Sequence, residues 1–132
     1  MSVKILIITH ENIGSALLNV ALKTFGKLPL PALVVPIHYN NDPEAICSRI
    51  NFLVTNLNNP DGILVLTDLF GSTPNNIARS LQNNFNVRVV SGVNLPMIIR
   101  VMNYPHLPLS ELAEKAISGG RDGVLNCAEC VG

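Results

Sequence analysis

Residues 62–76 have the sequence GILVLTDLFGSTPNN. The stretch begins with a continuous apolar run, 62–67, of the kind found in strands that are buried on both faces of a parallel sheet. A glycine-containing turn follows, and then Ser72-Thr73-Pro74, which places a capping hydroxyl and a proline at the start of a helix. This order predicts a buried strand that passes through a tight turn into a helix, the repeating unit of an α/β fold.

The same alternation of strand and helix extends over the rest of the chain. Three further apolar runs predict buried strands at residues 3–9, 33–37 and 87–91, and helical spacing predicts helices at 13–25, 42–57, 94–102 and 110–117. Residues 123–125 favour a short last strand at the sheet edge. We therefore expect one domain over residues 1–132, an α/β fold with three α/β/α layers, a mainly parallel four-stranded sheet and a frayed tail after about residue 126.

Charge and hydropathy exclude several function classes. Nine basic and nine acidic residues cancel without forming runs, so the sequence does not predict a nucleic-acid or membrane-surface binder. The apolar runs are far shorter than the roughly 20 residues that span a bilayer. Because residues 1–4 also lack the features of a signal peptide, we expect a cytoplasmic protein without membrane insertion.

The cysteines do not predict a disulfide framework. Cys47, Cys127 and Cys130 form an odd set in a chain without a secretion signal, which favours reduced thiols. Cys127 and Cys130 have the spacing of a redox motif, but no helix follows them, so a disordered tail is the better interpretation than a thiol switch.

The chemistry is expected at the carboxyl ends of the first and third strands, because parallel α/β sheets bind ligands where strand order reverses. There His10 and Asp68 would face one crevice. A neutral imidazole nitrogen is a good nucleophile near neutral pH and also a good leaving group, and a neighbouring carboxylate can hold its other ring nitrogen. These residues predict a phosphoryl carrier on His10, oriented by Asp68.

The turn after the third strand could bind the phosphoryl oxygens. Gly71, Ser72 and Thr73 would offer backbone N–H groups, two hydroxyls and the positive end of a helix dipole. Capping of the helix is an equally good interpretation of both hydroxyls. His38 and His106 have no motif around them, and we expect both to be solvated loop residues without a role.

Four pieces in order give a resemblance to a known family. They are Thr9-His10, Asp68 followed by Gly71-Ser72-Thr73-Pro74-Asn75, the segment 91–97 (SGVNLPM) and the segment 120–124 (GRDGV). Together they resemble the mannose-type enzyme IIA of the sugar phosphotransferase system, over nearly the whole chain. The resemblance implies a phosphorylated His10 partnered by Asp68, HPr as the phosphoryl donor, a separate enzyme IIB as acceptor, no metal or cofactor, and a homodimer that can exchange a terminal strand.

Several alternatives remain open at the level of sequence. The turn 70–74 (FGSTP) replaces the tryptophan-glycine-glycine-serine-proline turn of many sugar-transporting members, and the chain has no tryptophan. A stand-alone regulatory phosphoprotein or the phosphotransfer subunit of dihydroxyacetone kinase would use the same histidine. A receiver domain is disfavoured for two reasons. It would carry acidic magnesium ligands just after the first strand, where this chain has His10-Glu11, and a lysine after a later strand, whereas no lysine lies between Lys27 and Lys115. A metal-dependent hydrolase would need a fuller ligand set.

Overall fold

A computed structural model describes residues 2–57 and 59–129 as alternating strands and helices. The elements are β1 (Lys4–His10), α1 (Ile13–Phe25), β2 (Ala32–Ile37), α2 (Pro43–Leu57), β3 (Ile63–Thr67), α3 (Thr73–Ser80), the 3-10 turn η1 (Leu81–Asn83), β4 (Val87–Ser91), α4 (Leu95–Met102), α5 (Leu109–Asp122) and the 3-10 turn η2 (Cys127–Glu129). All strand pairs are parallel, in the order β2-β1-β3-β4.

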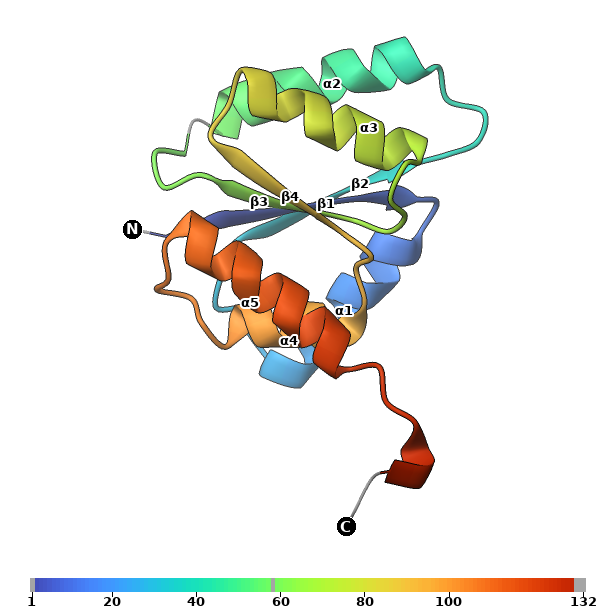
Figure 1. The fold of residues 1–132 in the computed structure, drawn as a ribbon. Coiled ribbons are helices and arrows are strands. Elements are labelled where there is room, and N and C mark those ends of the chain that lie inside the picture. The colour runs from blue at the N-terminus through green and yellow to red at the C-terminus, as the bar shows by residue number, and fades with distance from the viewer. Residues whose placement is uncertain (1, 58, 130–132) are drawn as a thin grey trace.

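Helices cover both faces of this sheet. Figure 1 shows α2 and α3 on one face and α1, α4 and α5 on the other, which confirms the predicted three-layer α/β fold. From β1 the chain moves to β2 on one side, and it then places β3 and β4 on the other side of β1. Strand order therefore reverses between β1 and β3, where α/β sheets form their ligand crevice.

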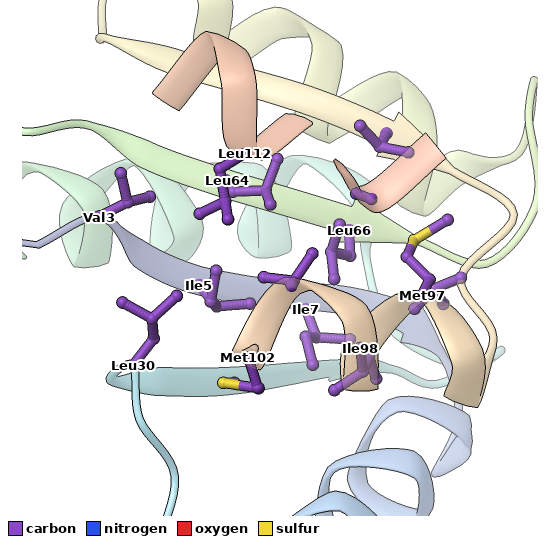
Figure 2. Close-up of a cluster of buried hydrophobic side chains, with 14 of the residues drawn as sticks. Val3, Ile5, Ile7, Leu30, Leu64, Leu66, Met97, Ile98, Met102 and Leu112 are labelled. Atoms are coloured by element: carbon purple, nitrogen blue, oxygen red, sulfur yellow. The ribbon is translucent and has the colours of Figure 1, made fainter. Parts of the chain in front are cut away.

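Two apolar layers hold the sheet between the helices, because successive side chains of a strand point to opposite faces. On the side of α4 and α5, residues of β1 and β3 pack with helical side chains (Figure 2), among them Ile5, Ile7, Leu64, Leu66, Met97, Ile98, Met102 and Leu112. The opposite layer joins the other strand residues to α2 and α3, including Leu6, Ile8, Val65, Ile46, Ile50, Val54 and Ile77. The five residues of β3 are all buried, as its continuous apolar run predicts.

The last helix differs from the prediction. The sequence placed its end at about residue 117, before Gly119 and Gly120, whereas α5 continues to Asp122. A Cβ at Gly119 would lie 2.6 Å from Cβ of Arg100, and one at Gly120 would lie 2.9 Å from Cε of Met97. These glycines therefore permit close packing of α5 on α4 instead of ending the helix.

The short strand predicted at residues 123–125 is absent from the described chain, so that prediction is wrong. Gly123 caps α5, and Val124 and Leu125 are 75% and 65% exposed, since α5 directs the chain away from the sheet (Figure 1). Cys47 and Cys127 are free thiols, and Cys130 lies outside the described residues. Within the described ranges, no helix has the length and apolar character required to cross a membrane.

Candidate functional site

The carboxyl ends of β1 and β3 bring an imidazole and a carboxylate into contact. His10 is the last residue of β1, and Asp68 directly follows β3. Nδ1 of His10 lies 2.8 Å from Oδ2 of Asp68, and the backbone N–H of His10 donates to the same oxygen at 3.0 Å. The Asp68 carboxylate therefore binds both the ring and the backbone N–H of His10 and holds the ring at the carboxyl end of the sheet.

This contact determines which nitrogen of His10 is available. An ionised carboxylate only accepts hydrogen bonds, so Nδ1 carries the proton that it donates to Asp68. In the neutral ring, Nε2 then holds the lone pair. The His10 side chain is 24% exposed and that of Asp68 is 10% exposed, so the imidazole is accessible while the carboxylate is mostly covered. Oδ1 of Asp68 is buried and has no hydrogen-bond partner among the described residues.

Two buried threonines anchor the segments that carry the pair. The hydroxyl of Thr9, which precedes His10, accepts the backbone N–H of Gly14 at 2.9 Å. This bond satisfies one of the donors at the start of α1. The hydroxyl of Thr67, which precedes Asp68, donates to Oδ1 of Asn75 in α3 at 2.9 Å. Each strand end is thus fixed to the helix that follows it, and the positions of His10 and Asp68 are fixed with them.

Close packing explains the glycine in the first of these connections. A Cβ at Gly14 would lie 2.8 Å from Cγ2 of Ile7 and 3.1 Å from Oγ1 of Thr9. Only a residue without a side chain lets α1 begin this near to β1.

The β3–α3 turn uses its residues in different ways. Gly71 has a φ of +81°, a left-handed conformation that favours glycine. The hydroxyl of Ser72 donates to the carbonyl of Leu69 at 2.6 Å and accepts the backbone N–H of Asn75 at 3.5 Å. Ser72 therefore shapes the turn and caps α3, so its hydroxyl proton is already committed within the protein.

A pocket of about 170 Å³ lies beside His10, and it includes Thr73 but neither Gly71 nor Ser72. Thr73 and Pro74 of α3 line one part of it. The rest comes from the end of β2, the β2–α2 loop and the start of α2, namely Ile37, His38, Tyr39, Asn41 and Pro43. Of the three turn residues considered for phosphoryl binding, Thr73 is thus the one that shares a pocket with His10.

Sequence reasoning missed a second carboxylate–imidazole contact at this site. Oε2 of Glu11 contacts Nδ1 of His38, and Oε1 of Glu11 accepts the backbone N–H of Tyr39 at 3.1 Å. Both bonds lower the pKa of the Glu11 carboxyl below its ordinary value, and the bond to His38 has the larger effect. His38 does lie in the loop after β2, and 43% of its side chain is exposed, but its contact with Glu11 was not predicted. Parallel pairing of His10 with Ile37 was the signal, because it places residues 11 and 38 next to each other.

Glu11 also has an unusual backbone. Its φ of +46° falls in the left-handed region, which costs a non-glycine residue roughly 1 kcal/mol or more. Its contacts with residues 37–39 hold it in this conformation.

The third histidine lies elsewhere. His106 lines a depression with Val3 and Asp61, residues that precede β1 and β3, so it occupies the opposite end of the sheet. The part of the chain that the structure describes contains no group of three or more His, Cys, Asp or Glu side chains arranged to hold a metal ion.

A family model and a curated relative both match this chain over most of its length. The family model for the "PTS system fructose IIA component" matches residues 4–117. The mannose-specific EIIAB component of the phosphotransferase system from Escherichia coli K12 is 28% identical over 127 residues, which are 94% of this chain but 39% of that protein. The chain thus spans about two fifths of the length of this curated relative.

Solved structures show the same fold. The mannose/sorbose-specific IIA subunit of Enterococcus faecalis superposes with a TM-score of 0.87 at 26% identity, covering 96% of this chain and 95% of that one. The EIIA component from Streptococcus agalactiae gives a TM-score of 0.84 at 23% identity, with 97% and 99% covered.

Proposed function

The chain belongs to the family of PTS system fructose IIA components, and from this premise we propose that His10 carries a phosphoryl group between two proteins of the phosphoenolpyruvate-dependent sugar phosphotransferase system. The observation that carries the proposal is the contact between Nδ1 of His10 and Oδ2 of Asp68 at the carboxyl ends of β1 and β3. It gives a partly exposed imidazole a fixed orientation and a lone pair on its outer nitrogen.

The proposed step is an in-line transfer from a phosphohistidine of HPr. Nε2 of His10 attacks the phosphorus atom, the new N–P bond forms, and the N–P bond to the donor histidine breaks. The donor ring takes the electron pair of that bond. Positive charge that develops on the His10 ring is stabilised through Nδ1–H by Asp68, as a carboxylate does for imidazolium in other enzymes.

The phosphoryl oxygens would be bound at the start of α3. Thr73 lines the pocket beside His10 and offers its hydroxyl and its backbone N–H where the helix dipole favours negative charge. Pro74 has no N–H, and the N–H of Asn75 is bonded to Ser72. Gly71 and Ser72 contribute through the shape of this turn, since the Ser72 hydroxyl is bonded to Leu69. No metal ion or organic cofactor takes part in this scheme.

We propose a separate enzyme IIB as the acceptor and the cytoplasm as the location, both from the family resemblance. A homodimer is also proposed. The outer edge of β4 has no neighbouring strand among the described residues, and Val89 of β4, Met97 of α4 and the exposed Val124 line a depression of about 440 Å³ beside it. An apolar segment from a second subunit could cover this edge.

The proposal is tested by mass spectrometry after incubation with phosphoenolpyruvate, enzyme I and HPr. We expect the gain of one acid-labile phosphoryl group, located on His10, and no gain in a His10→Ala protein. His106→Ala is the matched control, because it removes a histidine at the opposite end of the sheet and should be labelled normally. Labelling of the His10→Ala protein would refute the assignment, and so would an unlabelled native protein beside a labelled reference enzyme IIA.

A further inference from the structure

Glu11 is joined at three points to the last residue of β2 and to the two residues that follow it. Its backbone N–H donates to the carbonyl of Ile37 at 2.9 Å, and its two carboxylate oxygens bind the ring of His38 and the backbone N–H of Tyr39. Among the described residues, Glu11 is the only non-glycine residue with a positive φ. Since glycine adopts this backbone more readily, the presence of glutamate indicates that the side chain has a use here.

The segment bound by Glu11 forms a closed turn. The backbone N–H of His38 donates to Oδ1 of Asn41 at 2.9 Å, and the N–H of Asn41 donates back to the carbonyl of His38 at 3.0 Å. Tyr39 lies within this turn with 85% of its surface exposed. The carboxylate of Glu11 therefore determines where the backbone of Tyr39 sits relative to β1.

The held tyrosine lies next to the nucleophile. The centroids of the Tyr39 and His10 rings are 6.1 Å apart, with an angle of 32° between the ring planes, and both residues line the same pocket. A protein that approaches the His10 ring through this pocket therefore passes beside the Tyr39 ring. Tyrosine loses little conformational entropy when bound and is frequent among the residues that dominate protein interfaces.

Charge supports the same arrangement. The pKa of Glu11 is lowered, chiefly by the bond to His38, so the carboxylate is ionised at neutral pH. Both oxygens of this carboxylate are bonded to the turn, one to the His38 ring and the other to the backbone N–H of Tyr39.

We propose that Glu11 is a positioning residue for the transfer to His10, holding the Tyr39 ring beside the imidazole through the bonded turn 38–41. The inference rests on the proposed function, since it concerns how the phosphoryl donor reaches the same site. Tyr39 does not touch the reacting nitrogen in this scheme, so Glu11 affects the binding of the donor protein and leaves the chemical step unchanged.

The test compares Glu11→Ala, Glu11→Gly and Glu11→Gln in steady-state phosphorylation of His10 by phosphorylated HPr. Losing the bonds from the Glu11 carboxylate to His38 and Tyr39 should raise the KM for the donor about fivefold in the alanine and glycine proteins, equivalent to about 1 kcal/mol. The kcat should be unchanged. The glycine variant removes the side chain and also relieves the left-handed backbone of residue 11, so a role in the backbone alone predicts a normal KM there. Glu11→Gln keeps an acceptor for the Tyr39 N–H and should recover part of the effect.

Two further variants identify the path of the effect. Tyr39→Ala should raise KM to a similar extent, and adding Glu11→Ala to it should raise KM no further, because both changes act through one ring. Glu114→Ala is the matched control, since it removes an exposed carboxylate of α5 and should leave KM unchanged. A native KM in the Glu11→Gly protein would overturn the inference.

NMR of the tyrosine rings tests this inference independently of the proposed function. The protein has two tyrosines, and Tyr104 in the α4–α5 connection serves as the internal reference. In Glu11→Gly we expect the ring resonances of Tyr39 to shift and its contacts with the His10 ring to disappear, whether or not the protein accepts a phosphoryl group. Unchanged Tyr39 contacts would refute the positioning role, whereas an unlabelled native protein would refute the function alone.

Discussion

Replacing Asp68 with asparagine tests the orientation of His10 in detail. Oδ2 of Asp68 accepts both the ring and the backbone N–H of His10, at 2.8 Å and 3.0 Å. The amide oxygen of the asparagine should occupy this position, because an amide NH₂ there would face two donors. The hydrogen bonds persist, but the negative charge is lost.

The size of the effect follows from that difference. Hydrogen bonds to charged groups contribute about 1.5–3 kcal/mol and neutral ones about 0.5–1.5 kcal/mol, so the imidazolium-like transition state should lose about 1–1.5 kcal/mol. Transfer to His10 should slow about fivefold to tenfold. The amide nitrogen would lie at the buried Oδ1 position, which already has no partner in the described chain, so the protein should remain folded.

The assay is the single-turnover rate of phosphorylation by HPr, measured beside urea unfolding. Asp61→Asn is the matched control, because it removes the same charge before β3, at the opposite end of the strand from Asp68. A rate equal to that of the native protein would refute the orienting role. Complete loss of transfer in a folded Asp68→Asn protein would also contradict the reasoning, because it would require Asp68 to do more than orient and stabilise the ring.

The remaining predictions concern the surroundings of the pair. Gly14→Ala should destabilise the fold by about 1–3 kcal/mol in urea unfolding, because its Cβ would lie 2.8 Å from Cγ2 of Ile7; unchanged stability would show that α1 does not depend on this close approach. Gly71→Ala should cost about 1 kcal/mol through its backbone alone, since its Cβ would meet no atom within 4 Å, and a much larger loss would contradict that open space. Carboxyl NMR should find Glu11 titrating below its ordinary value of 4.5. Its contribution to stability should therefore be complete above that value and be lost as pH falls through the lower folded pKa; an unshifted midpoint would contradict the His38 contact.

Most of the fold could be predicted from the sequence because strong local signals agree with the tertiary structure. The β3 run is buried throughout, and Ser72 accepts the predicted capping bond with Pro74 at the helix start. The end of α5 could not be predicted, because Gly119 and Gly120 are compatible with two different structures. Locally they favour a helix end, whereas here they permit packing against Arg100 and Met97, which depends on a neighbour that local sequence does not reveal.

The site was only partly predictable for a related reason. His10 and Asp68 could be paired because both end neighbouring strands of a parallel sheet. Glu11 and His38 could be paired only from the register of β1 with β2, which composition and periodicity do not give. The separate uses of Ser72 and Thr73 likewise depend on the hydroxyl bond to Leu69, a feature of the folded turn.

The measurement that tests the central claim most directly is NMR of the phosphorylated protein with ¹⁵N-labelled histidine. The Nδ1 contact with Asp68 predicts a single phosphoryl group on Nε2 of His10, with Nδ1 still protonated and hydrogen-bonded. A phosphoryl group on Nδ1 of His10, or on His38 or His106, would contradict the account.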